Sequence, residues 1–307
     1  MGLETLVASD SNTYDILIIG AGPAGLTAAI YGCKANLKTG FIENNVPGGK
    51  VVNVPVITNY PGYQSISGAD LALNMYIQAT NLGAKYIYGK VVGIVKKNDY
   101  IVAFLDNGVN FFTKACIIAT GTINNKLSIK GEDQFINKGI SYCAVCDGSL
   151  AKNKDVAVIG NDTTTIENAK YMSNIAKTVY LLTNNSVDIN NLPKNVKIIA
   201  NATCKEFKGT NSLEQLVIQT DKEEVLDVSF VFVFNGITPS NDFLKDLEIT
   251  NDKGIINVDD NQQTKIPGLY AIGDISRNKY RQISTAIGDA ATATLSAIKH
   301  VKEKYKK

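Results

Sequence analysis

Two stretches of the chain, which begin 140 residues apart, share one order of hydrophobic and polar positions. Residues 15–43 consist of an apolar run, a turn of small residues, a helical run and a second apolar run. Residues 155–183 repeat that order. Short continuous apolar runs are typical of strands buried on both faces of a parallel sheet. Each stretch therefore predicts a strand–helix–strand unit, and the repeat predicts two related domains.

Two further apolar runs are predicted to join the sheet of the first repeat. One ends in Thr120-Gly121 and the other in Gly273-Asp274, so the second repeat lies between them in the chain. We therefore expect an α/β fold of two Rossmann-like, three-layer domains, with the second inserted into the first. The expected boundaries are 1–121 and 241–307 for the first domain and 122–240 for the inserted domain.

The turn of the first repeat, Gly20-Ala-Gly22-Pro-Ala-Gly25, has the glycine spacing of dinucleotide-binding sites. Gly20 permits a tight turn, Gly22 lets the backbone approach a pyrophosphate, and Gly25 lets the helix pack closely on the strand. The phosphates would then meet N–H groups at the positive end of the helix. Glu43 lies 23 residues after Gly20, where an acid accepts hydrogen bonds from ribose hydroxyls. The first repeat therefore predicts a bound dinucleotide.

The second repeat has Asp162 and Thr165 where the first has its second and third glycines. A carboxylate at position 162 would lie beside a pyrophosphate, and two like charges about 4 Å apart repel by roughly 4 kcal/mol at an effective dielectric constant of 20. Thr183-Asn-Asn185 then offers neither an acid for a ribose hydroxyl nor a base for a 2′-phosphate. We predict that this second site binds no nicotinamide nucleotide. The alternative is a degenerate site that still works.

Composition and charge exclude several classes of protein. Basic and acidic residues number 31 and 29, so the net charge of +2 is too even to suggest nucleic-acid binding. No stretch approaches 18 apolar residues, so we expect no membrane span, and the N-terminus lacks a signal-peptide pattern. We expect a cytoplasmic protein. Only Arg277 and Arg281 are arginine, so no guanidinium before them can hold a phosphate bidentately.

Cys143-Ala-Val-Cys146 lies between the two repeats. A C-x-x-C sequence near strand–helix–strand units in a cytosolic chain is typical of a redox dithiol. A zinc site would need two more ligands, and the chain has one histidine, His300. We predict a redox dithiol and no metal, with a zinc site or a pair of structural thiols as the alternatives. The other cysteines are expected to be buried small hydrophobic residues; they are Cys33, Cys116 and Cys204.

Seven short motifs occur together and in order along the chain. They are Gly20-Ala-Gly-Pro-Ala-Gly25, Pro47-Gly-Gly49, Asn59-Tyr-Pro-Gly62, Ala119-Thr-Gly121, Cys143-Ala-Val-Cys-Asp147, Gly273-Asp274 and Arg281-Gln282. With this combination the whole chain resembles the low-molecular-weight, FAD-dependent thioredoxin reductases. The resemblance implies that the first domain binds FAD, that the inserted domain carries the dithiol, and that the protein is a homodimer.

The resemblance also implies roles for individual residues. Cys146 should face the flavin, Cys143 should attack thioredoxin, and Asp147 should be the acid–base group beside them. The residues implied to bind FAD come from the first glycine turn, the end of the second strand and several loops of the first domain. They are Gly20, Gly22, Pro23, Ala24, Glu43, Gly48, Gly49, Lys50, Asn59, Val92, Thr120, Gly121, Gly273, Asp274, Arg281, Gln282 and Ile283.

The departure from the family lies in the inserted domain, because ordinary members have a glycine fingerprint and basic residues there. The pattern is similar to the ferredoxin-dependent flavin thioredoxin reductases, which lack a working nicotinamide site. We therefore expect electrons to pass from reduced ferredoxin through FAD to the Cys143–Cys146 disulfide and on to thioredoxin. The alternatives are an NADPH-dependent reductase, a related flavin enzyme with another donor, and a flavoprotein that only binds partners. The lysine-rich tail, 299–307, is either a docking patch for an acidic ferredoxin or a solvated helix end.

Overall fold

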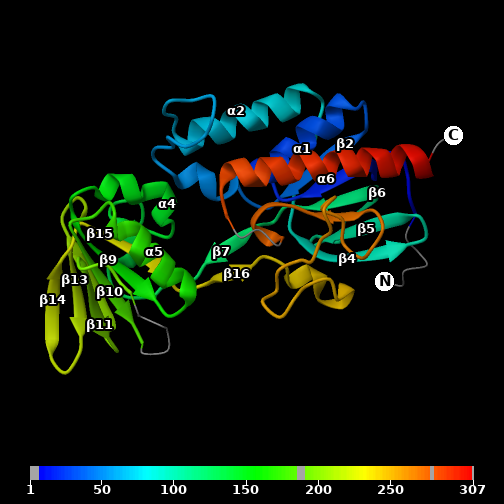
Figure 1. Cartoon of the computed structure of the whole chain (residues 1–307). Coiled ribbons are helices and arrows are strands. Elements are labelled where there is room, and N and C mark those ends of the chain that lie inside the picture. The colour runs from blue at the N-terminus through cyan, green and yellow to red at the C-terminus, as the bar shows by residue number, and fades with distance from the viewer. Residues whose placement is uncertain (1–6, 185–190, 277–279, 306–307) are drawn as a thin grey trace. The chain divides into compact units, whose positions relative to one another are not determined.

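The structure is a computed structural model that describes residues 7–184, 191–276 and 280–305 (Figure 1). The chain divides into two compact units, Met1–Ile123 with Pro239–Lys307, and Asn124–Thr238. The expected boundaries lay after residues 121 and 240, whereas the units meet after residues 123 and 238. Strands β7 (Thr122–Asn124) and β16 (Ile237–Pro239) pair where the chain passes from one unit to the other and back.

The first unit contains a seven-stranded sheet in the order β3-β2-β1-β6-β5-β4, with β17 paired to β6. The pairs β1–β2, β1–β6, β2–β3 and β6–β17 are parallel, whereas β4–β5 and β5–β6 are antiparallel. The strands are β1 Thr13–Ile19, β2 Thr39–Glu43, β3 Lys85–Tyr88, β4 Val91–Lys97, β5 Tyr100–Leu105, β6 Asn110–Ile118 and β17 Leu269–Ala271. The helices are α1 Pro23–Lys34, α2 Gly68–Asn81, α6 Ile283–Lys304 and the 3₁₀ helices η2 Gly49–Asn53, η4 Asp242–Leu247 and η5 Gly273–Ile275.

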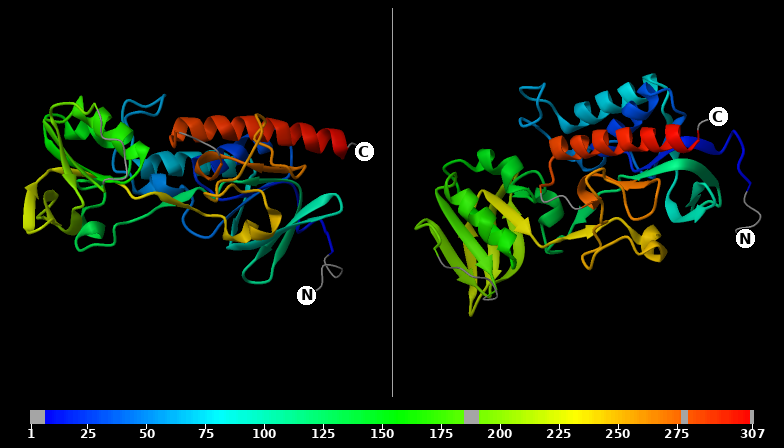
Figure 2. Two further views of the ribbon diagram at one scale, coloured as in Figure 1. Left: turned by 60° about the horizontal axis from the view of Figure 1, so that its bottom comes forward. Right: turned by 45° about the vertical axis from the view of Figure 1, so that its right-hand side comes forward.

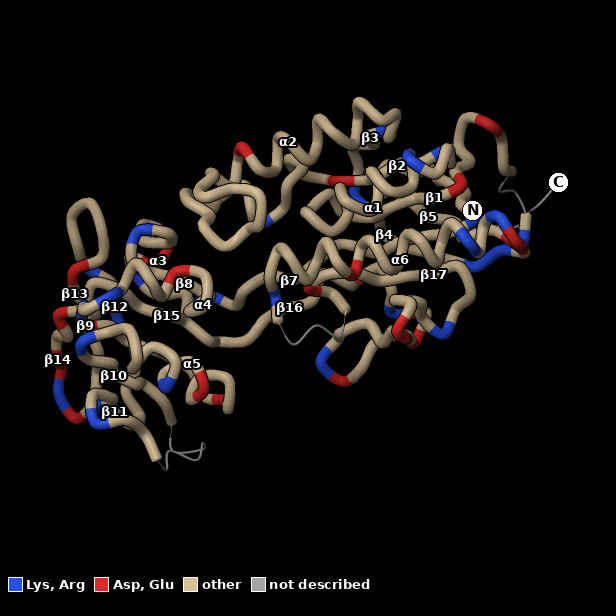
Figure 3. Tube along the Cα trace, turned by 45° about the horizontal axis from the view of Figure 1, so that its top comes forward, with Lys and Arg blue, Asp and Glu red and all other residues tan. Residues whose placement is uncertain are grey.

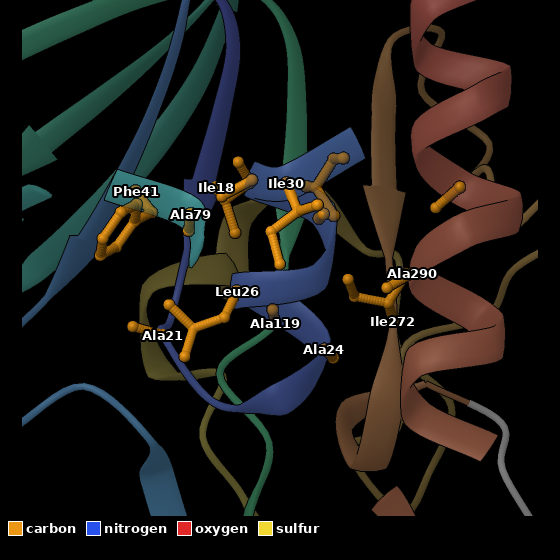
Figure 4. Close-up of a cluster of buried hydrophobic side chains, with 14 of the residues drawn as sticks. Ile18, Ala21, Ala24, Leu26, Ile30, Phe41, Ala79, Ala119, Ile272 and Ala290 are labelled. Carbon is orange, nitrogen blue, oxygen red and sulfur yellow. The ribbon is translucent and has the colours of Figure 1, made fainter. Parts of the chain in front are cut away.

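A hydrophobic core joins this sheet to its helices (Figure 4). Ile18 of β1 and Phe41 of β2 are fully buried, as are Leu26 of α1 and Ala290 of α6. Burying a side chain the size of leucine contributes about 1.5–3 kcal/mol. Alanines on α1 and α6 allow the two helices to approach each other closely. The apolar residues that predict strands and helices in the sequence are therefore the residues that pack around β1.

The parallel strands of the first unit end at one edge. Ile19 at the end of β1 pairs with Ile42 of β2 and with Ile118 of β6, and Ile118 pairs with Ala271 of β17. The turns that follow these strands consequently lie together, as expected for the carboxyl edge of a doubly wound sheet. This edge carries the predicted FAD residues.

The second unit contains a parallel five-stranded sheet in the order β11-β10-β9-β15-β8 and an antiparallel sheet β12-β13-β14 (Figure 2). Helix α5 packs on β9 and β10. The strands are β8 Ile140–Ser141, β9 Asp155–Gly160, β10 Thr178–Thr183, β11 Val196–Ala200, β12 Thr203–Gly209, β13 Leu213–Gln219, β14 Glu223–Asp227 and β15 Phe230–Phe234. The helices are α3 Glu132–Phe135, α4 Ala144–Asp147, α5 Thr163–Ser173 and the 3₁₀ helix η3 Gly148–Ala151.

The predicted α/β fold with two Rossmann-like domains is confirmed. The antiparallel strands β4, β5 and β12 to β14 did not follow from the repeated pattern, because that pattern describes only strand–helix–strand units. Acidic and basic residues are interspersed along both units (Figure 3). Among the residues that the structure describes, no helix is long and apolar enough to cross a membrane.

Candidate active site

The turn after β1 has the geometry that its glycines predict. Gly20 has a φ of +100°, and a Cβ there would lie 2.5 Å from the carbonyl oxygen of Ala119. A Cβ on Gly25 would lie 1.9 Å from the carbonyl oxygen of Gly20. Neither position admits a side chain, and only glycine adopts this conformation at Gly20 without strain. Helix α1 therefore begins directly against the end of β1.

The amino end of α1 is open. Gly22 is the N-cap residue, no side chain accepts a hydrogen bond from the first turn of the helix, and a Cβ on Gly22 would meet nothing within 4 Å. Pro23 begins the helix and Ala24 is buried. Gly49 comes so close that a Cβ on it would lie 3.2 Å from the Cα of Gly22. Helix N–H groups without a cap attract phosphate, so these residues fit the pyrophosphate of FAD.

Glu43 ends β2 beside this turn. Its Oε2 accepts a hydrogen bond from the Ala21 N–H at 2.9 Å, and its Oε1 accepts one from the Asn45 N–H at 2.9 Å. Its carbonyl oxygen accepts from the Gly89 N–H at 3.1 Å, three residues before the exposed Val92 of β4. Backbone donors thus hold the carboxylate at the carboxyl edge of the sheet, where the spacing of Glu43 from the glycine turn predicts a ribose.

A second group of predicted residues meets around Asp274. Lys50 Nζ donates to Thr122 Oγ1 at 2.9 Å and forms an ion pair with Asp274 Oδ2 at 3.4 Å. Burial lowers the pKa of the Lys50 ammonium group, and the nearby Asp274 carboxylate opposes that effect. Gly273 has a φ of +71° and a Cβ there would lie 3.3 Å from the Cβ of Ala24. Thr122 was not among the predicted residues, because its partners Lys50 and Asp274 are 72 and 152 residues away.

The other predicted FAD residues line the same edge. Asn59 Nδ2 donates to Gln282 Oε1 at 3.2 Å, and Gln282 caps the amino end of α6. Thr120 Oγ1 donates to the carbonyl oxygen of Ser240 at 2.7 Å. The remaining members are Gly48, whose N–H donates to the Ala21 carbonyl at 2.7 Å, Gly121 with a φ of +66°, the exposed Arg281 and the half-buried Ile283.

The two cysteines of the C-x-x-C sequence form a disulfide in the second unit. Cys143 is the N-cap residue of α4, and its Sγ accepts a hydrogen bond from the Cys146 N–H at 3.2 Å. Cys143 is half-buried and Cys146 is exposed. The backbone N–H that faces Cys143 Sγ would also stabilise a thiolate there after reduction. The expected role of Cys143 as the attacking sulfur stays a prediction, because Cys146 is the more exposed of the two in the disulfide.

Asp147 follows Cys146 in the chain and is held by a residue that was not among the predicted ones. Ser141 Oγ donates to Asp147 Oδ2 at 2.5 Å, and the Cys143 N–H donates to Ser141 Oγ at 3.0 Å. Ser141 ends β8 and is 5% exposed. A signal existed, because this hydroxyl precedes the first cysteine by two residues, but β8 is too short to be predicted from a hydrophobic pattern.

The other cysteines differ from this pair. Burial raises the pKa of the Cys116 and Cys204 thiols to about 12, and it also raises that of Cys33. A high pKa leaves little thiolate at neutral pH, so these thiols are poor nucleophiles. In the described part of the chain no three His, Cys, Asp or Glu residues are grouped as metal ligands.

In the second repeat, one of the chain's own side chains caps the amino end of α5. Asp162 is the N-cap residue, and its Oδ1 accepts hydrogen bonds from the Thr165 N–H at 2.8 Å and from Thr165 Oγ1 at 2.7 Å. Thr165 is fully buried. The carboxylate therefore lies at the amino end of α5, where a bound pyrophosphate would need the N–H groups.

The cavity beside this turn has an uncharged described lining. Asn161 Oδ1 accepts a hydrogen bond from the Asn184 N–H at 2.7 Å, so a side chain joins the turn to the end of β10. The cavity there has a volume of about 260 Å³, and its described lining carries no charge; it consists of Ile159, Gly160, Asn161, Leu182, Thr183, Asn184, Asn201 and Ala202. Asn185 lies outside the described residues. No cation in this lining could hold a 2′-phosphate.

Comparison with known proteins places these sites in a family. Residues 14–290 match the sequence model of the pyridine nucleotide-disulphide oxidoreductases. The chain belongs to that family. A thioredoxin reductase of Mycoplasma genitalium is 40% identical over 301 residues, which cover 94% of this chain and 96% of the relative. A thioredoxin reductase of Listeria monocytogenes is 36% identical and covers 97% of both chains.

Solved structures show the same likeness. The thioredoxin reductase of Streptococcus pyogenes superposes with a TM-score of 0.91 at 35% identity, covering 95% of this chain and 99% of the other. The ferredoxin-flavin thioredoxin reductase of Clostridium acetobutylicum has a TM-score of 0.53 at 30% identity, covering 96% and 99%.

Membership confirms part of what the sequence predicted. The chain is a flavin disulfide oxidoreductase of the thioredoxin reductase type, and FAD as its cofactor is confirmed. The relatives do not establish the ferredoxin-dependent subtype, because the Mycoplasma and Listeria proteins are named thioredoxin reductase without a stated donor.

Proposed function

We propose that this protein reduces thioredoxin and that its electrons come from reduced ferredoxin rather than from a nicotinamide nucleotide. The observation that carries the choice of donor is the Asp162 carboxylate, which caps the amino end of α5. A pyrophosphate there would meet a negative charge about 4 Å away, at a cost of roughly 4 kcal/mol at an effective dielectric constant of 20. The neutral cavity beside Asn161 offers no cation to offset that cost.

Energetics permit a ferredoxin donor. Low-potential iron–sulfur proteins lie at about −400 mV and thioredoxin at about −270 mV. The gap of roughly 130 mV corresponds to about 6 kcal/mol for two electrons. The likeness to a ferredoxin-flavin thioredoxin reductase, at 30% identity over nearly the whole chain, supports the same donor class.

The dithiol chemistry follows from the site. FAD held by the first unit would supply redox chemistry that takes up electrons one at a time and gives them up in pairs. The reduced Cys143 attacks one sulfur of the thioredoxin disulfide, that S–S bond breaks, and a mixed disulfide forms. Cys146 then attacks Cys143 Sγ, which restores the enzyme disulfide and releases thioredoxin with two thiols. Two electrons and two protons leave the enzyme, and we propose that Asp147, which follows Cys146 in the chain, accepts a thiol proton.

The lysine-rich tail is a poor candidate for the donor's docking patch. Helix α6 begins beside Gln282 at the FAD edge and continues for 22 residues, which is about 33 Å at 1.5 Å per residue. At its far end Lys304 pairs with Asp99 at 2.9 Å. Lys306 and Lys307 lie outside the described residues. We therefore propose that ferredoxin docks elsewhere, nearer the carboxyl edge of the sheet.

We further propose that the protein is a cytoplasmic homodimer, as the family resemblance implies. Leu73 and Ile77 of α2 are one helical turn apart and are 53% and 43% exposed. Subunit interfaces use contiguous exposed apolar surface, and we propose that these two residues are part of it. Light scattering of the FAD-loaded protein would test the oligomeric state.

An NADPH-dependent reductase is the second candidate. The observation in its favour is that the Mycoplasma and Listeria relatives are named thioredoxin reductase with no ferredoxin in the name. It requires NADPH to bind despite Asp162.

Anaerobic stopped-flow measurement of flavin absorbance decides between the donors. We expect NADPH to leave the flavin oxidised and reduced ferredoxin to bleach it, more slowly at high salt because the Debye length shrinks from about 10 Å at 0.1 M to 3 Å at 1 M. Dithionite, which needs no docking site, is the control for a reducible flavin. Rapid bleaching by NADPH with none by ferredoxin would refute the proposal.

A further inference from the structure

Ser141 is placed to act on the dithiol chemistry through Asp147. The Ser141 hydroxyl has one proton and two possible acceptors, Asp147 Oδ2 at 2.5 Å and the Cys143 carbonyl oxygen at 3.3 Å. An O–H···O⁻ bond of about 2.5–2.7 Å is typical of a charge-assisted bond. The proton is therefore donated to the carboxylate of Asp147.

The position of Ser141 is fixed by the sheet rather than by the loop. It pairs with Phe232 of β15 in parallel register, while Ile140 before it pairs with Val231. Ser141 is 5% exposed, and the fully buried Phe232 lies in the core below it. Both residues of β8 are buried, so their pairing with β15 restricts the movement of the Ser141 hydroxyl.

The anchor fixes one carboxylate oxygen and leaves the other available. Asp147 Oδ2 takes the Ser141 hydrogen bond, whereas Asp147 Oδ1 has no hydrogen-bond partner among the described residues. The chain turns through the short helix α4, so Asp147 returns to Ser141 from six residues later while the disulfide lies in between. Oδ1 is consequently the atom that can accept a thiol proton.

We infer that Ser141 is a positioning residue, which holds the Asp147 carboxylate in the orientation that serves the Cys143–Cys146 pair. The inference rests on the proposed acid–base role of Asp147. It does not depend on the identity of the electron donor. Ser141 touches neither sulfur in this arrangement, so its effect is expected only while a carboxylate is present at position 147.

A competing explanation is structural. The Cys143 N–H donates to Ser141 Oγ at 3.0 Å, so removing the hydroxyl also leaves that N–H without its acceptor. If this were the important contact, Ser141→Ala would disturb the loop whether or not Asp147 were a carboxylate. The two explanations therefore differ in a double-mutant cycle.

The experiment uses the full-length, FAD-loaded protein. The Cys143–Cys146 disulfide is reduced with dithiothreitol, the reductant is removed without oxygen, and the dithiol is mixed with the aromatic disulfide 5,5′-dithiobis(2-nitrobenzoate). In this reaction one enzyme thiolate breaks the probe's S–S bond and releases a thionitrobenzoate. The second thiolate then closes the enzyme disulfide and releases another. The electrons come from the dithiol itself, so neither ferredoxin nor thioredoxin is needed.

We expect Asp147→Asn to slow this reaction by about 100-fold, the lower range for loss of a general acid or base. Ser141→Ala should slow it by about 10-fold, as a carboxylate loses its orientation. The double variant should react no more slowly than Asp147→Asn alone. Ser149→Ala is the matched control, because Ser149 is an exposed serine of the neighbouring η3, and it should leave the rate unchanged.

Three outcomes would overturn the inference. If Ser141→Ala slows the reaction equally in both backgrounds, its role is the structural contact with Cys143. If Ser141→Ala has no effect while Asp147→Asn does, Ser141 orients nothing that matters. If Asp147→Asn itself has no effect, the acid–base part of the proposed function fails and the inference fails with it.

Discussion

The two repeats of this chain share a frame and differ in what that frame can bind. In the first, the N-cap residue Gly22 has no side chain and the amino end of α1 is open. In the second, Asp162 has the same place and its carboxylate caps α5. The apolar runs that build the strands are alike in both, so the fold does not depend on the turn. Binding depends on a few positions of the turn, which can change while the fold remains.

The hydrogen bond between the turn and the end of the second strand also differs between the repeats, because its donor and acceptor exchange places. In the first repeat the Ala21 N–H donates to the Glu43 side chain, which ends β2. In the second, the Asn161 side chain accepts from the Asn184 N–H just beyond β10. One arrangement presents a carboxylate at the edge of the sheet, whereas the other places an amide in the turn. In the second repeat, the polar side chains of the turn thus accept hydrogen bonds from the protein's own backbone, so fewer of them remain for a ligand.

The largest expected effect is the loss of thioredoxin reduction without loss of FAD, which would separate the functions of the two units. Cys143→Ser and Cys146→Ser should each abolish thioredoxin reduction, because each removes one of the two sulfurs that must exchange. Both variants should keep stoichiometric FAD, since the predicted FAD residues lie in the first unit. Turnover and flavin absorbance of the purified variants measure the two effects. Loss of FAD in either variant would contradict the separation.

Placing the acid of the second repeat into the first should destroy FAD binding. The carboxylate of the Gly22→Asp variant would lie about 4 Å from the pyrophosphate. Their repulsion costs roughly 4 kcal/mol of binding free energy, which corresponds to an affinity for FAD that is about 1,000-fold weaker. Gly22→Asn has nearly the same shape without the charge and is the matched control. A Cβ at this position meets nothing within 4 Å, so both variants should fold.

Flavin content after purification, with circular dichroism to verify folding, gives the result. If Gly22→Asp retains stoichiometric FAD, a carboxylate at this position does not exclude a pyrophosphate. The explanation of the second site would then be wrong as well.

A smaller effect concerns stability. Asp162→Ala should lower the free energy of unfolding by about 1 kcal/mol, because the Thr165 N–H loses its cap. Gly22→Ala, which places alanine at the equivalent position of the first repeat, removes no capping side chain and should not produce this loss in protein stripped of FAD. Urea unfolding of both variants gives the comparison. An equal loss at both positions would show that the cap is not what distinguishes the repeats.

The last change is expected to have no effect on the reduction of the flavin by NADPH. Asp162→Gly with Thr165→Ala restores glycine and a small residue to the second turn, yet NADPH should still not bleach the flavin. The described lining of the cavity has no cation for a 2′-phosphate. The same stopped-flow measurement applies, with the unchanged protein as the control. If the double variant gains NADPH reduction, Asp162 and Thr165 together were sufficient to prevent NADPH binding, and no basic residue is needed.

Much of the molecule is determined by local patterns in the sequence. Gly20 and Gly25 stand where a Cβ would collide with backbone, so the spacing of the turn was sufficient to place them. The apolar runs at β1, β9 and their partners determined the α/β class, because burial on both faces of a parallel sheet demands such runs. The cysteine pair followed from a spacing of three residues, which a single turn of chain brings together.

Other features were decided only by the tertiary structure. Thr122 lies between Lys50 and Asp274, which are 224 residues apart, and such a contact depends on the strand order of the sheet. Ser141, which donates to Asp147, is held by the pairing of β8 with β15, whose paired residues lie 91 positions later in the chain. The sequence alone predicted that Asp162 would repel a phosphate. The structure added that this carboxylate stabilises α5, since a helix end leaves N–H groups that some acceptor must satisfy.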